Sequence, residues 1–427
     1  MNNEMESIIP LSIAKCKFGV GATEELGFEL RNLGARKVML VVDPHLWAFD
    51  LVDRVKTIIE KERLELSIFD EIHFEPTDVS IRRAIARAQQ FDFDVIVALG
   101  GGSTIDTAKA MNLYATYPAD LYDYINVPIG KGRLVPGPLK PLITLPTTSG
   151  GGAEITPVIV LDLVELRVKT GISHPYITPA LAIVDPINML SAPAAVTAGT
   201  GVDVLTHAVE SFTTKPYNTR PRTQDPGIRP TYIGANPVSD TWSEKAIEWI
   251  GKYLRRAVFN GNDLEARNYV AMAATFAGIG FGNAGVHIPH ALAYPIAGMV
   301  RDWVPPGYDV AEPIIPHGIS AILTLAASIR FTAPTNYARH ARIGELLGLD
   351  TAHLTPIEAA LLLPDAIIQL MKDIGLPNGL NAVGYTQADI PQLTEGGWQQ
   401  PRLLVGSPRR VTKEDLSRIL EESLTLW

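Results

Sequence analysis

Cysteine is almost absent from this sequence: Cys16 is the only one in 427 residues. A framework of disulfide bonds is therefore impossible, and an intracellular location is expected. Uncharged apolar runs of about 18 residues are also lacking, which argues against a membrane-spanning helix. The first ten residues carry Glu4 and Glu6 but no basic residue, unlike a signal or transit peptide. The sequence alone thus predicts a cytoplasmic protein with no membrane partner.

Dense blocks of lysine and arginine are missing too, and the formal net charge is −9. Both features argue against a nucleic-acid partner. Hydrophobic residues make up 46% of the chain and charged residues 19%, which provides ample apolar material for a core. The length fits two or three domains of about 100–200 residues each.

Short runs rich in Val, Ile and Leu alternate with amphipathic stretches between Lys37 and Pro186. The runs are apolar on both faces, and helical patterns such as 51–62 and 79–90 separate them. This alternation predicts a parallel sheet covered by helices on both sides. The expected strands are 37–43, 66–69, 94–99 and 141–145, with an appended hairpin formed by 156–162 and 166–172.

Strand-like runs disappear after Ala192, and long helical patterns replace them. The sequence therefore predicts an α/β domain over residues 1–192 and an all-helical domain over residues 193–427. The expected helices of the second domain are 200–213, 240–259, 263–277, 319–329 and 356–374.

Two glycine-rich and hydroxyl-rich loops follow predicted strands of the sheet. Glycine lets the backbone approach a pyrophosphate, and the free N–H groups that open a helix favour its negative charge. Open parallel sheets bind ligands at the carboxyl ends of their strands. The loops therefore predict a dinucleotide site, with tight strand-to-helix turns as the alternative. Their residues are Gly100, Gly101, Gly102 and Ser103 in the first loop, and Thr147, Thr148, Ser149 and 150–152 in the second.

Asp43 ends the first strong strand of the predicted sheet. A carboxylate there can accept hydrogen bonds from the adenosine ribose and would repel a 2′-phosphate, which favours NAD over NADP. The alternative is a turn residue before Pro44.

Asp203, His207 and Glu210 are spaced i, i+4 and i+7, so they share one face of an apolar helix. A buried carboxylate and imidazole one turn apart need partners, which either a metal or a simple Asp–His hydrogen bond provides. His290 and His317, each beside glycine or proline, are further candidate ligands. Asp203 and the three histidines together suit Fe²⁺, Zn²⁺ or Mn²⁺.

The remaining histidines are interpreted differently. His287 lies one turn before His290, and it either faces the same cavity or caps local structure. The others are expected to be solvated in loops or exposed stretches: His45, His73, His174, His340 and His353.

These elements, in this order, resemble the iron-containing alcohol dehydrogenase family over roughly residues 12–380. The first glycine loop with Asp106 and Lys109 matches the family's phosphate-binding signature, and 147–152 matches its second cofactor loop. The resemblance implies a dehydroquinate synthase-like fold and a metal- and NAD-dependent oxidoreductase. Fe²⁺ is the expected ion, with Zn²⁺ or Mn²⁺ as alternatives. Asp106 is expected to contact the cofactor, as are Thr156 and Lys169 in the hairpin.

The hydroxyacid–oxoacid transhydrogenase branch is the most similar, on motifs at 75–78, 129–132, 229–232, 277–287 and 383–391. It converts 4-hydroxybutyrate and 2-oxoglutarate into succinate semialdehyde and 2-hydroxyglutarate with a retained nicotinamide. The alternatives are a general NAD-dependent alcohol dehydrogenase and a metal- and NAD-dependent lyase or cyclase. The chain has Tyr294 where most of the family has histidine and Gly151 where threonine is usual. The sequence also lacks the mitochondrial leader peptide of that branch, which again favours a cytoplasmic location.

Tyr294 and His287 are the side chains expected to pass the alcohol proton to solvent. The loop 215–229 contributes Arg220, Arg222 and Arg229, which are suited to clamp a substrate carboxylate. The alternative is a solvent or subunit-contact loop. We expect small-molecule substrates and a homo-oligomer, either a dimer or a larger assembly.

Overall fold

The computed structural model describes residues 5–11, 13–226 and 229–427. Within it the chain divides into two compact units, of which one spans residues 13–192. The other contains residues 193–427 together with the N-terminal segment 5–11. That segment joins the helical unit because Glu6 N–H donates to the carbonyl of Arg220 at 2.9 Å, and Met5 forms a β-bridge with Pro221.

The first unit is built on a six-stranded, fully parallel sheet in the order β1-β8-β5-β4-β2-β3. This confirms the predicted parallel sheet, and an antiparallel β6–β7 pair confirms the hairpin. The two strands that the sequence did not reveal, β1 and β8, have only four residues each. The strands are β1 Lys15–Phe18, β2 Lys37–Val42, β3 Glu65–Phe69, β4 Val95–Gly100, β5 Leu142–Pro146, β6 Val158–Leu163, β7 Val168–Ser173 and β8 Leu181–Val184.

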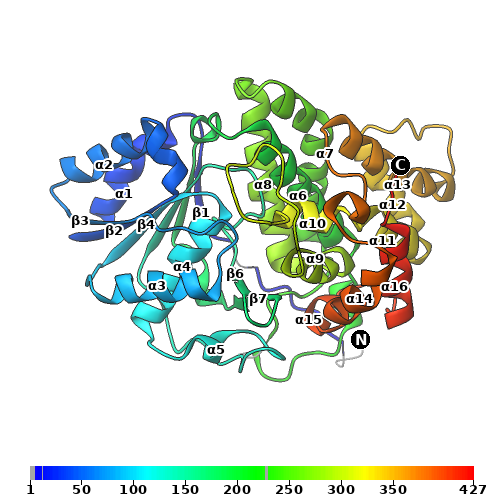
Figure 1. Cartoon of the computed structure of the whole chain (residues 1–427), viewed down its shortest axis with the longest axis horizontal. Helices are drawn as coiled ribbons and strands as arrows, with labels where there is room; N and C mark the ends of the chain where they lie inside the picture. Colours follow the sequence, from blue (N-terminus) through cyan, green and yellow to red (C-terminus); the bar gives the residue numbers. More distant parts are fainter. Residues whose placement is uncertain (1–4, 12, 227–228) are drawn as a thin grey trace. The chain divides into compact units, whose positions relative to one another are not determined.

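Helices cover both faces of this sheet (Figure 1). Alternate residues of β2 point to opposite sides, so Val38 and Leu40 pack in the cluster that includes helices α1 and α2. Met39 and Val41 pack in the cluster that includes α3 and α4. Each face of β2 is therefore apolar, as the sequence pattern required. The helices are α1 Leu26–Asn32, α2 Leu51–Lys61, α3 Asp78–Gln89, α4 Gly102–Thr116 and the short α5 Leu121–Tyr124.

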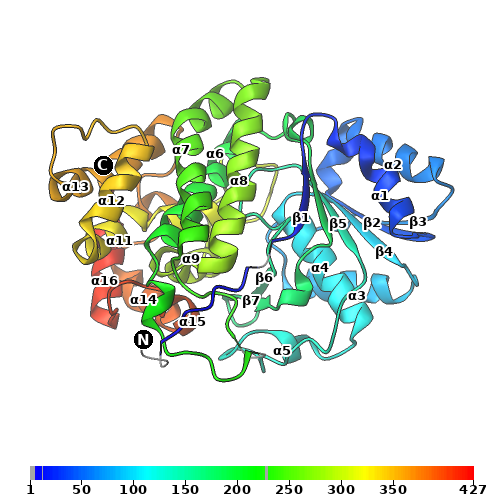
Figure 2. The same cartoon turned by 180° about the vertical axis from the view of Figure 1, so that it is seen from behind.

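The second unit is helical throughout its regular elements, and Figure 2 shows α6, α7 and α8 packed side by side. The helix predicted over 200–213 begins earlier, at Ala194, and the one predicted over 319–329 is split into α10 and α11. The helices are α6 Ala194–Thr213, α7 Pro237–Phe259, α8 Leu264–Ala284, α9 Ile288–Gly298, α10 His317–Ile322, α11 Leu325–Thr332, α12 Tyr337–Leu346, α13 Pro356–Asp373, α14 Ile390–Trp398, α15 Pro401–Leu404 and α16 Lys413–Glu422.

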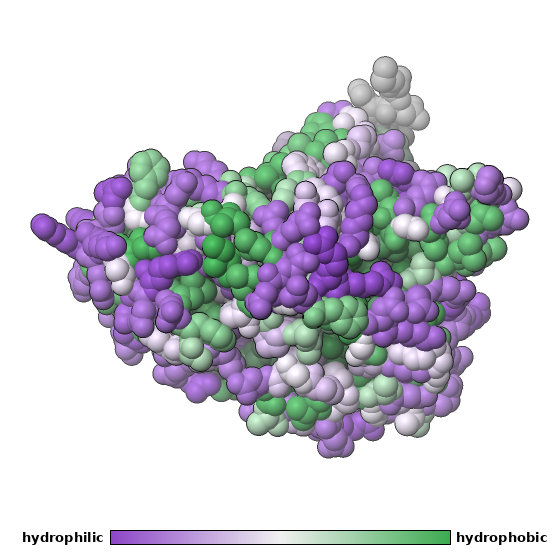
Figure 3. Space-filling view, turned by 90° about the horizontal axis from the view of Figure 1, so that it is seen from above, coloured by the Kyte–Doolittle hydropathy of each residue, from purple (hydrophilic) through white to green (hydrophobic). Residues whose placement is uncertain are grey.

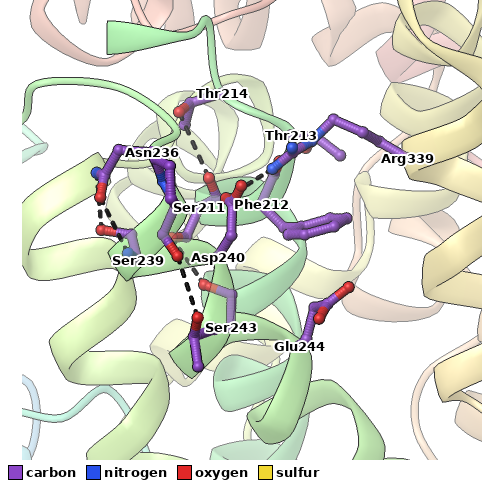
Figure 4. Close-up of polar contacts among 12 residues, drawn as sticks. Ser211, Phe212, Thr213, Thr214, Asn236, Ser239, Asp240, Ser243, Glu244 and Arg339 are labelled. Carbon is purple, nitrogen blue, oxygen red and sulfur yellow. Dashed lines mark hydrogen bonds and ion pairs between the residues drawn. The ribbon is translucent and has the colours of Figure 1, made fainter.

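The C-terminal end of α6 is fastened to its neighbours by polar contacts (Figure 4). The Arg339 guanidinium donates to the carbonyl of Phe212 at 2.7 Å and pairs with Asp240 at 2.6 Å. A guanidinium at this position satisfies a terminal carbonyl and complements the helix dipole. Ser243 donates to Ser211 at 2.9 Å, which ties α7 to the same turn. These contacts fix the helix that carries the candidate site.

Two further expectations concern surfaces and exposure. In the described part of the chain, no single helix is long and apolar enough to cross a membrane. Helices α8 and α9 reach the necessary length and apolar character only together, and the chain bends by 106° between them. Polar and apolar residues are interspersed on the face drawn in Figure 3. The prediction that His340 is solvated is wrong: it is buried on α12, where its Nε2 lies 3.0 Å from the Thr332 hydroxyl.

Candidate functional site

Helix α6 presents Asp203 and His207 on one buried face, with 4% and 5% of their surfaces exposed. His207 is oriented by its Nδ1, which lies 2.9 Å from the carbonyl oxygen of Asp203. Phe281 stacks on its ring at 4.0 Å between centroids. The spacing of four residues thus places both side chains together, as the sequence predicted.

Two other helices bring His290 and His317 to the same place. His290 lies in the first turn of α9, and His317 opens α10. The close approach of α10 to α6 requires Gly318, because a Cβ there would lie 2.2 Å from the carbonyl oxygen of Gly199. One ligand atom from each of Asp203, His207, His290 and His317 lies within 4.8 Å of the others.

The charges of these groups suit a cation. Burial alone would raise the pKa of Asp203, but the three imidazoles around it lower that pKa below its usual range. Burial lowers the pKa of His207 to about 3, against the opposing effect of Asp203. An ionised carboxylate and a neutral imidazole are the forms that bind metals. Burial would lower the pKa of His290, but Glu210 and Asp203 raise it to about 10, so this imidazole must release a proton when it binds an ion.

The buried atoms of the cluster also fit a divalent ion. Asp203 Oδ1 and His290 Nε2 have no hydrogen-bond partner among the described residues, although they lie 3.7 Å from each other. Buried polar atoms of this kind require a compensating partner. Three imidazole nitrogens and one carboxylate oxygen suit a first-row divalent metal. The residues present therefore fit the ion that the sequence predicted.

Glu210 is the residue whose role the sequence left unassigned, although its i+7 spacing placed it on the same face. It is fully buried, and its carboxylate contacts His290 Nδ1. The i+7 spacing already placed Glu210 on this face of the helix. Its contact with His290 depends on the position of α9, which the sequence does not show.

The two side chains predicted as a proton relay lie in different surroundings. Tyr294 is buried one turn beyond His290 on α9, and its ring centroid lies 6.3 Å from that of His317. His287 Nε2 lies 3.0 Å from the hydroxyl of Thr213. That hydroxyl already donates to the carbonyl of Val209 at 2.7 Å, so it accepts from His287. The structure thus places Tyr294 beside the histidine cluster, whereas the side chain of His287, at the N-cap of α9, is tied to Thr213 of α6.

In the α/β unit, the two predicted cofactor loops lie at one edge of the sheet, because β4 and β5 are adjacent and parallel. Gly101 is the N-cap of α4. Thr147 N–H donates to the carbonyl of Gly100 at 3.1 Å, and a Cβ on Gly101 would lie 3.1 Å from the Thr148 hydroxyl. A Cβ on Gly102 would meet nothing within 4 Å, so the backbone is open there.

Three polar side chains near these loops have protein partners. Ser103 Oγ accepts from Glu75 N–H at 3.1 Å, and the hydroxyl of Ser149 contacts the sulfur of Met189 at 3.0 Å. Asp43 accepts from the backbone N–H of His45 at 3.0 Å and caps the 3-10 helix Pro44–Ala48. The turn role of Asp43 is therefore present, and its ribose contact stays a prediction.

Asp106 and Lys169 fasten the β6–β7 hairpin. Asp106 accepts from Val160 N–H at 2.9 Å, and burial raises its pKa to about 6. Lys109 donates to the carbonyls of Thr156 and Val158.

The buried Lys169 pairs with Glu75 and Asp162, each at 2.8 Å. Contact of Asp106, Thr156 and Lys169 with a cofactor stays a prediction.

Two of the three arginines of the 215–229 loop have hydrogen-bond partners within the protein. Arg220 donates to the carbonyl of Tyr232 at 2.8 Å, and Arg229 donates to the carboxylate of Glu6 at 3.2 Å. Arg222 is half-buried. Two of the three predicted clamp residues thus hold the loop and the N-terminal segment.

Comparison with known proteins identifies the architecture. The model of the "Iron-containing alcohol dehydrogenase" family matches residues 14–186, and the family's C-terminal model matches residues 231–424. Among solved structures, a 1,3-propanediol oxidoreductase is similar at 30% identity, with a TM-score of 0.85 over 98% of this chain and 100% of that one. A sulfoacetaldehyde reductase from Bifidobacterium kashiwanohense, solved with NAD⁺, has 25% identity and a TM-score of 0.79 over 98% and 99% of the chains.

Curated relatives extend the similarity over nearly the whole chain. The mitochondrial hydroxyacid–oxoacid transhydrogenase of Homo sapiens is 44% identical over 98% of this chain and 90% of its own length. A probable enzyme of the same name from Dictyostelium discoideum is 42% identical over 96% and 78%. The predicted cytoplasmic location is contradicted by this finding, because these relatives are named as mitochondrial. Both family models and these relatives show that the chain belongs to the iron-containing alcohol dehydrogenases, a family of metal- and NAD-dependent oxidoreductases.

Proposed function

We propose that this chain is a hydroxyacid–oxoacid transhydrogenase that converts 4-hydroxybutyrate and 2-oxoglutarate into succinate semialdehyde and 2-hydroxyglutarate. The observation that carries the proposal is the 44% identity over 98% of the chain to the human enzyme of that name. The buried cluster of Asp203 and three histidines supports oxidoreductase chemistry, but it does not by itself select the substrate.

The reaction balances without an outside oxidant. The carbinol carbon of 4-hydroxybutyrate gives up a hydride and its hydroxyl group gives up a proton, and the keto group of 2-oxoglutarate takes up both. When bound, the divalent ion supplies Lewis-acid polarisation of the substrate oxygen, and the nicotinamide carries the hydride.

Within this proposal, different residues of the chain bind the ion, hold the transferred proton and bind the cofactor. Asp203, His207, His290 and His317 bind the ion. The hydroxyl of Tyr294, buried beside His317, holds the proton that leaves one substrate and enters the other. The backbone N–H groups at the start of α4 face the pyrophosphate of NAD.

The two domains have separate tasks in the same proposal. The α/β domain, predicted over residues 1–192, binds NAD, and the helical domain, predicted over 193–427, holds the metal and the substrate. We further propose a homo-oligomer, which sedimentation of the purified protein tests directly.

A label-transfer experiment tests the proposed reaction. 4-Hydroxybutyrate deuterated at its carbinol carbon is incubated with 2-oxoglutarate, the purified enzyme and an excess of unlabelled NADH. Deuterium retained at C2 of 2-hydroxyglutarate supports a transhydrogenase whose cofactor stays bound. Dilution of the label together with free NADH turnover would instead identify a general alcohol dehydrogenase that exchanges its cofactor.

A further inference from the structure

Glu210 joins α6 to the start of α9 through three contacts. One carboxylate oxygen accepts from the backbone N–H groups of His287 and His290, at 2.7 and 3.3 Å. The other oxygen contacts Nδ1 of the His290 ring. The glutamate side chain is fully buried, so these groups take the place of water around its charge.

The contacts with backbone N–H groups give α9 its N-terminal cap. His287 occupies the N-cap position but makes no side-chain cap hydrogen bond, and Pro289 lacks an N–H group. The carboxylate of Glu210, which comes from another helix, satisfies amides that would otherwise be orphaned. Its negative charge is also favourable at this end of a helix dipole. The turn that carries His290 is thereby fixed against α6.

The contact with the ring decides which nitrogen of His290 faces the cluster. With Nδ1 turned to Glu210, Nε2 lies 3.7 Å from the Asp203 carboxylate and has no hydrogen-bond partner among the described residues. A carboxylate behind a ligating imidazole fixes its tautomer and raises its basicity. His207 differs, because its Nδ1 faces a backbone carbonyl.

We propose that Glu210 is a positioning residue of the metal centre, which acts through His290. It keeps the proton of His290 on Nδ1 and presents Nε2 to the ion. The inference rests on the proposed ligand set, but it does not depend on which alcohol is the substrate.

The test measures metal affinity in the absence of substrate and cofactor. Metal-free protein is titrated with Zn²⁺ in competition with a chromogenic chelator. Glu210→Gln keeps the size of the side chain but removes its charge, and its amide can donate to Nδ1, which favours the wrong tautomer of His290. We expect the Kd for Zn²⁺ to rise about 10–100-fold. Glu6→Gln is the matched control, since Glu6 is also buried and accepts backbone N–H groups but contacts no histidine.

A double variant separates positioning from a general structural role. Because Glu210 acts through His290, adding Glu210→Gln to His290→Ala is expected to leave the weakened Kd unchanged. A Zn²⁺ Kd for Glu210→Gln equal to that of the wild type would overturn the inference, as would an equal loss in Glu6→Gln. If Glu210→Gln does not fold, Glu210→Asp replaces it: the shorter side chain draws the carboxylate away from Nδ1, and a wild-type Kd would again overturn the inference. Transhydrogenase activity of the wild type is measured separately, so failure of that proposal is distinguishable.

Discussion

Arg229 donates its Nε–H to the buried carboxylate of Glu6 at 3.2 Å, across 223 positions of the sequence. Glu6 also contacts the backbone N–H of Thr223 at 3.5 Å. The N-terminal segment is therefore attached to the loop that follows the helix carrying Asp203 and His207. Arg229, which the sequence suggested as a partner for the substrate carboxylate, instead binds a carboxylate of the protein itself.

Removal of this pair should lower stability. We expect Arg229→Ala to reduce the free energy of unfolding by about 1–3 kcal/mol, because a buried carboxylate loses its charged partner. The double variant with Glu6→Ala should lose less than the sum of the single changes. Urea unfolding measures both effects, and strictly additive losses would show that the two side chains do not interact.

The remaining arginine is the better candidate for a substrate carboxylate. We expect Arg222→Ala to lower kcat/KM for 4-hydroxybutyrate by about 10–100-fold, since a charge-assisted hydrogen bond contributes about 1.5–3 kcal/mol. Turnover of 1-butanol, which has no carboxylate, should change much less. Arg220→Ala is the comparison, because its partner is the Tyr232 carbonyl and its loss should affect both alcohols alike. Equal losses for both alcohols in Arg222→Ala would exclude it as a clamp.

The ligand set makes a prediction about metal content. His290→Ala and His317→Ala should each lower the bound metal and reduce turnover to background while the helical fold persists. Elemental analysis, circular dichroism and activity are measured on the same samples. Chelation of the wild type should abolish activity, and added Fe²⁺, Zn²⁺ or Mn²⁺ should restore it. Full activity in both variants would contradict the assignment.

Asp43 is expected to exclude NADP. Two unit charges about 4 Å apart in water interact by about 1 kcal/mol, so Asp43→Asn should narrow the preference for NAD by about fivefold. Asparagine keeps an oxygen that can accept from His45 N–H, whereas Asp43→Gly removes the cap as well. Affinities for the two cofactors provide the measurement. An unchanged preference in both variants would leave Asp43 as a turn residue only.

Tyr294→Phe should lower kcat by about 100-fold, because the ring stays beside His317 while the proton-carrying hydroxyl is lost. Metal content should stay at the wild-type level. His287→Gln should have a smaller effect on kcat, since Nε2 of His287 is engaged in a hydrogen bond with Thr213. A larger loss in His287→Gln than in Tyr294→Phe would reverse the two roles.

Local patterns in the sequence determined much of this protein. Strands β2, β4 and β5 are almost entirely buried and apolar on both faces, so their residues identified a covered parallel sheet without any knowledge of the fold. The glycine loop at 100–102 and the spacing of Asp203 and His207 are likewise local, because a turn or one helical period fixes the geometry. Strands β1 and β8 were missed, since four residues are too short to show a period.

Only the tertiary structure decided which distant groups meet. The sequence placed Glu210 on the face of Asp203 and His207, but its contact with His290 depends on how α9 packs against α6. In the same way, three arginines close in sequence looked like one cluster, yet Arg229 turns to Glu6 and Arg220 turns to Tyr232. A buried charge takes the partner that folding brings within hydrogen-bond distance, and sequence spacing carries no information about a partner more than 200 residues away.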